Sequence, residues 1–173
     1  MQNNIRVMIG LLLLCFAMSC SKSATNDTAS TANETPPIAS VNVVKATPQE
    51  LTLTRGESGD ALVLLKIADG YHVNANPPSY SYLKATELEL QSAAGITVEF
   101  ITYPDALTKK FQFAEKPLAV YEGETMLKAT LKADKTAPAG IHNLSAKLRV
   151  QACDDKVCYA PSALDLTVPV NIK

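Results

Sequence analysis

The sequence contains no tryptophan and only seven glycines, and its formal net charge is −1 over 173 residues. So few glycines exclude a collagen-like or low-complexity chain. A charge this close to zero provides no basic face for nucleic acid. Hydrolase signatures such as a nucleophile elbow, a phosphate-binding glycine loop or HExxH are missing too. With 47% hydrophobic and 19% charged residues, the composition is that of a globular protein.

The first twenty residues have the pattern of an export signal. Arg6 provides a positive n-region, and residues 7–18 form an apolar stretch of the length expected for a secretory h-region. No later apolar run reaches the roughly 18 residues needed to span a bilayer. The stretch Ala-Met-Ser-Cys that ends at Cys20 resembles the lipobox of bacterial lipoproteins. We therefore expect residues 1–20 to be a lipoprotein signal peptide and Cys20 to be lipidated; an ordinary cleaved signal with an incidental cysteine is the alternative.

Residues 21–40 read SKSATNDTASTANETPPIAS and contain almost nothing apolar. Such a segment cannot bury enough surface to offset the entropy of ordering it. It is typical of a flexible tether that holds a domain away from a membrane. The folded domain is then expected at residues 41–173, a size at which one domain supports its own core.

Alternation of apolar and polar residues dominates the expected domain, and no strong helical periodicity is present. A period of two is typical of strands with one buried face, and several such strands separated by turn residues favour an antiparallel sandwich. Pro169 falls in the last of them, which predicts an edge at that point. The expected strands are residues 61–68, 86–90, 96–103, 118–121, 126–132, 143–153 and 164–172.

Two cysteines, Cys153 and Cys158, lie in the stretch RVQACDDKVCYAPS with four residues between them. We expect residues 144–152 and 159–170 to be neighbouring strands joined by the loop 154–157. The cysteines then face each other at the mouth of a hairpin, where opposed Cα atoms lie about 4.5 Å apart, within reach of a disulfide.

The chemistry of this pair stays open on spacing alone. A bond across so short a loop gives little chain-entropy stabilisation, which weakens the interpretation as a structural staple. An exported location permits either a passive disulfide or a redox-active one. A metal site with His72 or His142 is a third alternative, but zinc prefers four ligands and closer cysteine pairs.

The tract VQACDDKVCYAP, residues 150–161, resembles the active-site hairpin of the N-terminal periplasmic domain of the disulfide-interchange protein DsbD. The pieces DGYHVNANPP (69–78), YP (103–104), KFQF (110–113) and VYEG (120–123) follow the order of that family, so the similarity spans residues 45–172. It implies an all-β, immunoglobulin-like antiparallel β-sandwich, in agreement with the alternation. The spacing departs from the best-known members, which have five residues between the cysteines.

The resemblance implies that Cys153 and Cys158 form a redox pair that relays electrons by thiol–disulfide exchange. Cys158 is then the more exposed sulfur that forms a mixed disulfide, and Cys153 resolves it. The family shields its cysteines with an aromatic cap, for which Phe111 or Phe113 is the candidate; packing in the core is the alternative for both.

Two tyrosines are further candidates at the site. Tyr159 is expected to flank the sulfurs, and Tyr71 to approach the hairpin together with His72, although packing in a turn and a strand also accounts for these residues.

The resemblance further implies partners and a location. The partners are a membrane-embedded thiol carrier, met in trans, and exported thioredoxin-like or disulfide-bonded proteins. The expected location is the bacterial cell envelope, with the domain in the periplasm on a lipid anchor. No cofactor and no metal is expected, and whether the chain is itself a protein-disulfide reductase stays open. The rival interpretation is a non-catalytic immunoglobulin-like binding lipoprotein with a structural hairpin disulfide.

Overall fold

The structure is a computed structural model and describes residues 39–173. The expected signal peptide, the lipidation site Cys20 and nearly all of the expected tether lie outside the described residues. Within them the chain forms strands and one short 3-10 helix, η1 (Ser40–Asn42), with no α-helix. No helix of the described part is long and apolar enough to cross a membrane.

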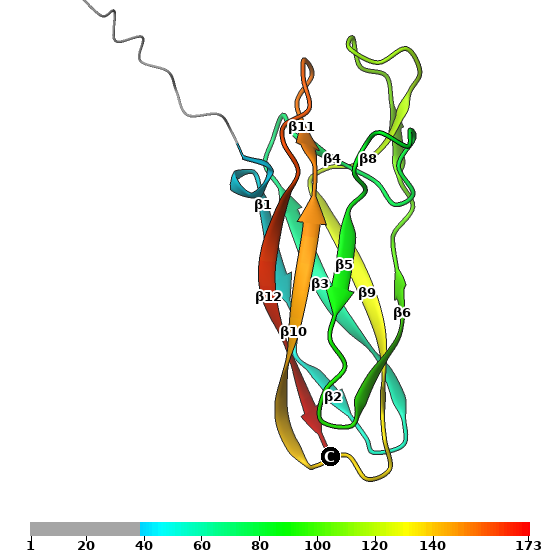
Figure 1. Cartoon of the computed structure of the whole chain (residues 1–173), viewed down its shortest axis with the longest axis vertical. Helices are drawn as coiled ribbons and strands as arrows, with labels where there is room; N and C mark the ends of the chain where they lie inside the picture. Colours follow the sequence, from blue (N-terminus) through cyan, green and yellow to red (C-terminus); the bar gives the residue numbers. More distant parts are fainter. Residues whose placement is uncertain (1–38) are drawn as a thin grey trace, which may run out of the picture. The chain divides into compact units, whose positions relative to one another are not determined.

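Two four-stranded sheets form the body of the domain (Figure 1). The first sheet has the order β1-β3-β9-β6, and all of its neighbours are antiparallel. Its strands are β1 (Val44–Pro48), β3 (Ser58–Ile67), β9 (Glu124–Ala133) and β6 (Ile96–Thr102).

The second sheet has the order β2-β12-β10-β5. Its long central pair β10–β12 is antiparallel and extends over eleven residues of each strand, whereas β2 joins β12 in parallel. The members of this sheet are β2 (Leu51–Leu53), β12 (Ser162–Ile172), β10 (Gly140–Val150) and β5 (Glu87–Leu90).

The core lies between the inward faces of these sheets. Alternate residues of β3 are buried, and β10 repeats the pattern with every second side chain inside. This period of two confirms the predicted sandwich, because successive side chains of a strand point to opposite faces. Each fully buried leucine contributes roughly 1.5–3 kcal/mol relative to an exposed one. The largest buried side chains of the two sheets include Leu65, Leu127, Leu131, Leu144 and Leu148.

A third, smaller sheet lies at one end of the domain, with the order β11-β4-β8-β7. Figure 1 shows β11, β4 and β8 at the end opposite the C-terminus. A separate apolar cluster supports this end: Leu83, Phe111, Leu118 and Val120. The strands are β11 (Ala152–Cys153), β4 (His72–Asn74), β8 (Leu118–Tyr121) and β7 (Leu107–Lys109).

All seven expected strands are present, but the short strands β1, β2, β4 and β7 were missed, and the expected strand 143–153 is interrupted at Gln151 and forms β10 and β11. The strands β2, β4 and β7 have three residues each, which is too few to show a reliable alternation. The edge prediction at Pro169 is correct only locally. The strand β12 lies between β2 and β10, yet β2 pairs only with Val170–Ile172, so no partner on that side needs the N–H that Pro169 lacks.

Candidate functional site: the Cys153–Cys158 hairpin

Cys153 and Cys158 form a disulfide at the end of the domain that carries the small sheet. Their Cα atoms lie 3.9 Å apart, and the two residues form an isolated antiparallel bridge beyond β10. Cys153 is completely buried, whereas Cys158 is partly exposed. The predicted hairpin mouth is therefore present, and only one of its two sulfur-bearing residues is open to solvent.

Asp154 organises the loop between the cysteines. Its Oδ1 accepts hydrogen bonds from the backbone N–H groups of Lys156 (2.7 Å) and Val157 (2.8 Å), and its Oδ2 accepts one from the hydroxyl of Tyr159 (2.6 Å). The bond from Tyr159, followed by those from the backbone, lowers the pKa of Asp154. The same carboxylate raises the pKa of Tyr159 to about 12. The loop is thus held in one conformation by an ionised side chain.

The strand β4 lies directly beside the buried cysteine. His72 is the register partner of Cys153, and the preceding Tyr71 packs its ring at a tilt against Tyr159, with centroids 6.1 Å apart. His72 is 1% exposed, and its Nε2 has no hydrogen-bond partner among the described residues. Tyr71 is packed in the turn before β4 and His72 in β4 itself, and both segments border the hairpin.

Burial lowers the pKa of His72, and the nearby carboxylate of Glu122 opposes that shift. His72 also lines a hollow together with Asp69, Lys109, Glu122 and Asp155. Lys109 donates to both carboxylate oxygens of Glu122, so part of the acidic charge on this side of the hairpin is neutralised.

Phe111 and Phe113 continue the arrangement as an aromatic stack. The ring centroids of His72 and Phe111 lie 4.0 Å apart, and those of Phe111 and Phe113 lie 5.5 Å apart. Phe111 is 4% exposed and belongs to the small apolar cluster that Cys158 also contacts. Phe113 is 40% exposed and lines the same surface hollow as Cys158. The cap candidates thus differ in position: Phe111 is a core residue, and Phe113 is on the rim.

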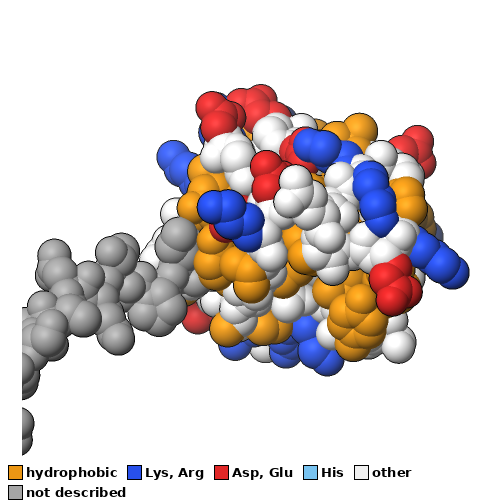
Figure 2. Space-filling model, turned by 90° about the horizontal axis from the view of Figure 1, so that it is seen from above, with side chains coloured by type: hydrophobic (Ala, Val, Ile, Leu, Met, Phe, Trp, Pro, Cys, Tyr) orange, Lys and Arg blue, Asp and Glu red, His pale blue; other side chains and the backbone are white. Residues whose placement is uncertain are grey.

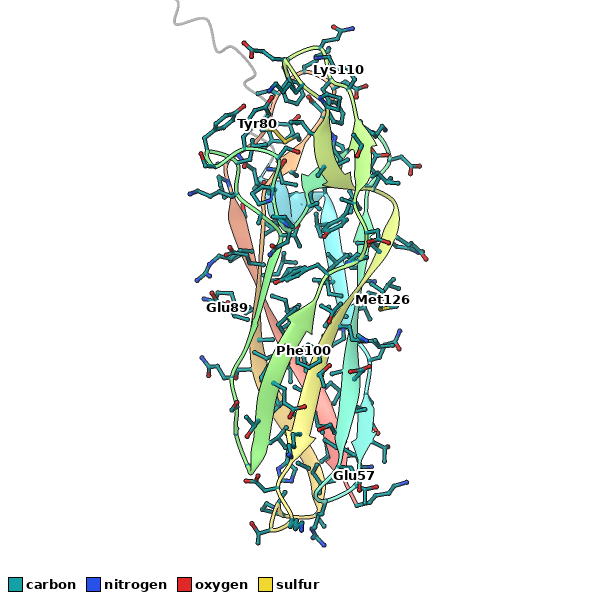
Figure 3. The ribbon with its side chains drawn as sticks, turned by 90° about the vertical axis from the view of Figure 1, so that its right-hand side faces the viewer. Glu57, Tyr80, Glu89, Phe100, Lys110 and Met126 are labelled. Carbon is teal, nitrogen blue, oxygen red and sulfur yellow. A yellow bond between two sulfur atoms is a disulfide. The ribbon has the colours of Figure 1, made fainter. Side chains whose placement is uncertain are left out.

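The rim around Cys158 is mainly apolar. Tyr82 is 70% exposed and Val157 is 49% exposed, and both line the hollow that contains Cys158 and Phe113. Seen from this end of the molecule, hydrophobic side chains are exposed between acidic and basic ones (Figure 2). Figure 3 shows Tyr80 and Lys110 at the same end, far from Glu57. The partly exposed Cys158 therefore adjoins a surface on which a partner protein can bury apolar area.

Two residues that hold the hairpin escaped prediction. Gln151 accepts hydrogen bonds at its Oε1 from the side-chain amide of Asn74 (3.0 Å) and the backbone of Lys84 (2.8 Å), and it donates to the carbonyl of Tyr159. Ser40, expected as the last residue of the tether, is completely buried and bonds to both sides of the hairpin. Ser40 belongs to no local motif, and although Gln151 lies within the tract 150–161, nothing in that tract indicates its bonds to Asn74 and Lys84.

The metal alternative gains nothing from the geometry. His142 lies near the start of β10 and the cysteines lie beyond its end, so this histidine is far from the pair. His72 lies beside Cys153, but the two cysteine sulfurs are bonded to each other in the disulfide. Among the described residues there is no group of three or more His, Cys, Asp and Glu side chains that could hold a metal ion.

Comparison with known proteins gives a family match. The family model described as "Thiol:disulfide interchange protein DsbD, N-terminal" matches residues 41–169. The N-terminal periplasmic domain of ScsB from Proteus mirabilis is 19% identical, with a TM-score of 0.45 over 74% of this chain and 45% of that chain. A family 123 glycoside hydrolase from Clostridium perfringens is 10% identical, with a TM-score of 0.34 over 76% of this chain and 27% of that one. The chain thus spans less than half the length of either protein, and both similarities are too weak to bear on the chemistry. No curated protein matches.

Proposed function

The chain belongs to the family of N-terminal domains of the thiol:disulfide interchange protein DsbD, and on this basis we propose that it relays electrons between two thiol proteins through Cys153 and Cys158. As a member of this family it is a thiol–disulfide interchange domain. The observation that carries the proposed relay is the unequal exposure of the two cysteines, one buried and one open at an apolar rim.

The exchange proceeds in two steps from the reduced domain. The thiolate of Cys158 attacks a disulfide of the partner, and a mixed disulfide forms while one partner sulfur leaves as a thiolate. The sulfur of Cys153 then attacks Cys158, which re-forms the internal disulfide and releases the partner as a dithiol. The partner gains two electrons and the domain loses two, and a reduced carrier restores the domain by the reverse sequence.

The position of Cys158 supports its role as the attacking sulfur. A partner protein has to bring its own disulfide into line with that sulfur, and the residue at position 153 is completely buried. After the mixed disulfide forms, the buried sulfur of Cys153 is already beside Cys158, because their Cα atoms are 3.9 Å apart. Resolution then needs no large backbone movement.

Phe113 is the proposed cap residue. It lies on the rim of the hollow that contains Cys158, and it is exposed enough to move without disrupting the core. Phe111 stacks between it and His72 and is proposed to support the cap from below. A ring over the disulfide limits attack by small thiols, whereas a docked partner displaces it.

The proposed partners follow from the family and the apolar rim. They are a membrane-embedded thiol carrier, met in trans, and thioredoxin-like or disulfide-bonded exported proteins. We place the domain in the periplasm, tethered to a lipid on Cys20 by the segment between Cys20 and the buried Ser40. This placement rests on the signal and lipobox pattern of the first twenty residues.

The deciding experiment measures the reduction potential of the pair by thiol trapping after equilibration in redox buffers. A value above about −250 mV is expected for an exchange-competent bond. The variant Cys153→Ala should also trap a thioredoxin-like partner as a mixed disulfide on Cys158, and the matched variant Cys158→Ala should not. A potential below about −300 mV without trapping would indicate a structural staple and favour the binding-module alternative.

A further inference from the structure

The hydroxyl of Ser40 bridges the two arms of the cysteine hairpin. The N–H of Ala152, the residue before Cys153, donates to its Oγ at 3.0 Å. The hydroxyl in turn donates to the carbonyl of Ala160, two residues after Cys158, at 2.7 Å. Ser40 is completely buried, and so is Ala152. One buried hydroxyl therefore connects the two arms of the hairpin through two hydrogen bonds.

This bridge is one of several links across the hairpin, among them the bond from the side chain of Gln151 to the carbonyl of Tyr159. At the tip, the N–H of Asp154 donates to the carbonyl of Val157 at 2.9 Å. Below the disulfide, the N–H of Tyr159 donates to the carbonyl of Ala152 at 2.8 Å. Direct backbone pairing of the arms is then interrupted, because β11 pairs with β4, and it resumes where Val150 pairs with Ser162 in the β10–β12 ladder. The hydroxyl of Ser40 links the arms within this interruption, where no direct backbone bond joins Ala152 to Ala160.

We propose that Ser40 is a positioning residue for the Cys153–Cys158 exchange centre, and that it sets the stability of the disulfide relative to the dithiol. The inference rests on the proposed exchange function and adds to it a residue that lies 112 positions before Ala152 in the sequence. Ser40 acts through the backbone on either side of the cysteines, because its hydroxyl bonds to Ala152 and Ala160.

The physical reason lies in the reduced state. Once the disulfide opens, hydrogen bonds across the hairpin keep the two sulfurs close together. Each sulfur then has a high effective concentration at the other, which favours re-formation of the disulfide. Loss of the Ser40 hydroxyl leaves the buried N–H of Ala152 without its acceptor, so the arms move apart between the disulfide and the β10–β12 ladder to recover a partner. The sulfurs then spend less time at bonding distance, which favours the dithiol.

The test compares three variants in dithiothreitol redox buffers. Ser40→Ala should lower the disulfide-to-dithiol equilibrium constant about threefold to tenfold, which is roughly 14 to 30 mV for a two-electron couple. Ser40→Thr retains the hydroxyl and should restore the wild-type constant. Thr130→Val is the matched control, because it removes a hydroxyl bond of 2.7 Å to Asp60 on the first sheet, away from the hairpin. It should lower stability and leave the constant unchanged.

Amide hydrogen exchange of the wild-type chain is a second test of the role of Ser40, and it needs no variant. The N–H of Ala152 should stay protected in both the disulfide and the dithiol form. Rapid exchange in the dithiol form would overturn the proposal, as would a folded Ser40→Ala chain with the wild-type equilibrium constant or with the same shift as Thr130→Val. A different result would show that the proposed exchange function is wrong: the wild-type chain would form no mixed disulfide with a thioredoxin-like protein, whatever the effect of the Ser40 variants.

Discussion

The imidazole of His72 and the ring of Phe111 stack with centroids 4.0 Å apart and planes inclined by 17°. His72 is at the same time the register partner of Cys153, so the stack connects the buried cysteine to the loop that carries Phe113. Three segments that are far apart in the sequence meet in this way at one end of the sandwich. The predictions below test what each of them contributes.

Phe111 and Phe113 should respond differently to truncation. Phe111→Ala should lower the free energy of unfolding by about 3 kcal/mol, because a buried aromatic ring is removed from a small cluster. Phe113→Ala should change it by no more than about 0.5 kcal/mol, because its ring is largely at the surface. It should instead accelerate reduction of the disulfide by a small thiol. Urea unfolding and stopped-flow reduction measure the two effects, and equal effects of both variants on both quantities would contradict the distinction.

The titration of His72 should make the folded domain less stable in mild acid. Burial lowers the pKa of His72 in the folded state, so the unfolded chain binds a proton first as the pH falls. Stability is then unaffected well above the ordinary histidine pKa of about 6.5 and declines below it, by at most about 1.4 kcal/mol per pH unit. Urea unfolding from pH 8 to pH 5 measures this decline.

The variant His72→Asn should abolish that decline, although it will also lower stability at every pH. His142→Asn is the matched control, because this histidine lies at the far end of β10 and its ring nitrogen is 2.8 Å from the carbonyl of Pro138. A His72→Asn chain that loses stability between pH 6.5 and pH 5 as steeply as the wild type would refute the assignment.

Asp154 should control the ionisation of Tyr159. Its carboxylate accepts a hydrogen bond from the phenol and raises the pKa of Tyr159 to about 12. Asp154→Ala removes that acceptor, so the pKa should fall toward the ordinary tyrosine value of about 10. The measurement is an NMR titration of the tyrosine ring carbons, with Tyr159→Phe to assign the signal. An unchanged titration would show that the hydrogen bond does not persist in solution.

Reduction of the disulfide should destabilise the domain only modestly. The bond closes a loop of six residues, for which the chain-entropy model gives about 2 kcal/mol. The two large sheets do not depend on it, because their core lies elsewhere in the sandwich. Urea unfolding with and without a phosphine reductant measures the difference, and global unfolding on reduction would indicate a structural staple rather than an exchange centre.

Much of the fold was accessible from the sequence because it depends on local patterns. A strand that buries one face must alternate apolar and polar residues, and this predicted seven of the strands and the sandwich. The hairpin was accessible for the same reason, since a short polar loop separates two alternating segments. Resemblance to a family, later supported by the family match, added the expectation of thiol–disulfide interchange.

Only the tertiary structure decided how the cysteine pair is held. His72 lies beside Cys153 because the two-residue strand β11 pairs with β4, and strands this short leave no periodic signal. Ser40 lies in a segment whose composition predicts a tether, and its role depends on a contact with residues 112 and 120 positions away. By itself, the sequence determined the sandwich, the hairpin and the positions of the two sulfurs, because these depend on neighbours in the chain. The buried imidazole, the rim and the serine bridge depend on packing between distant segments, which no local pattern encodes.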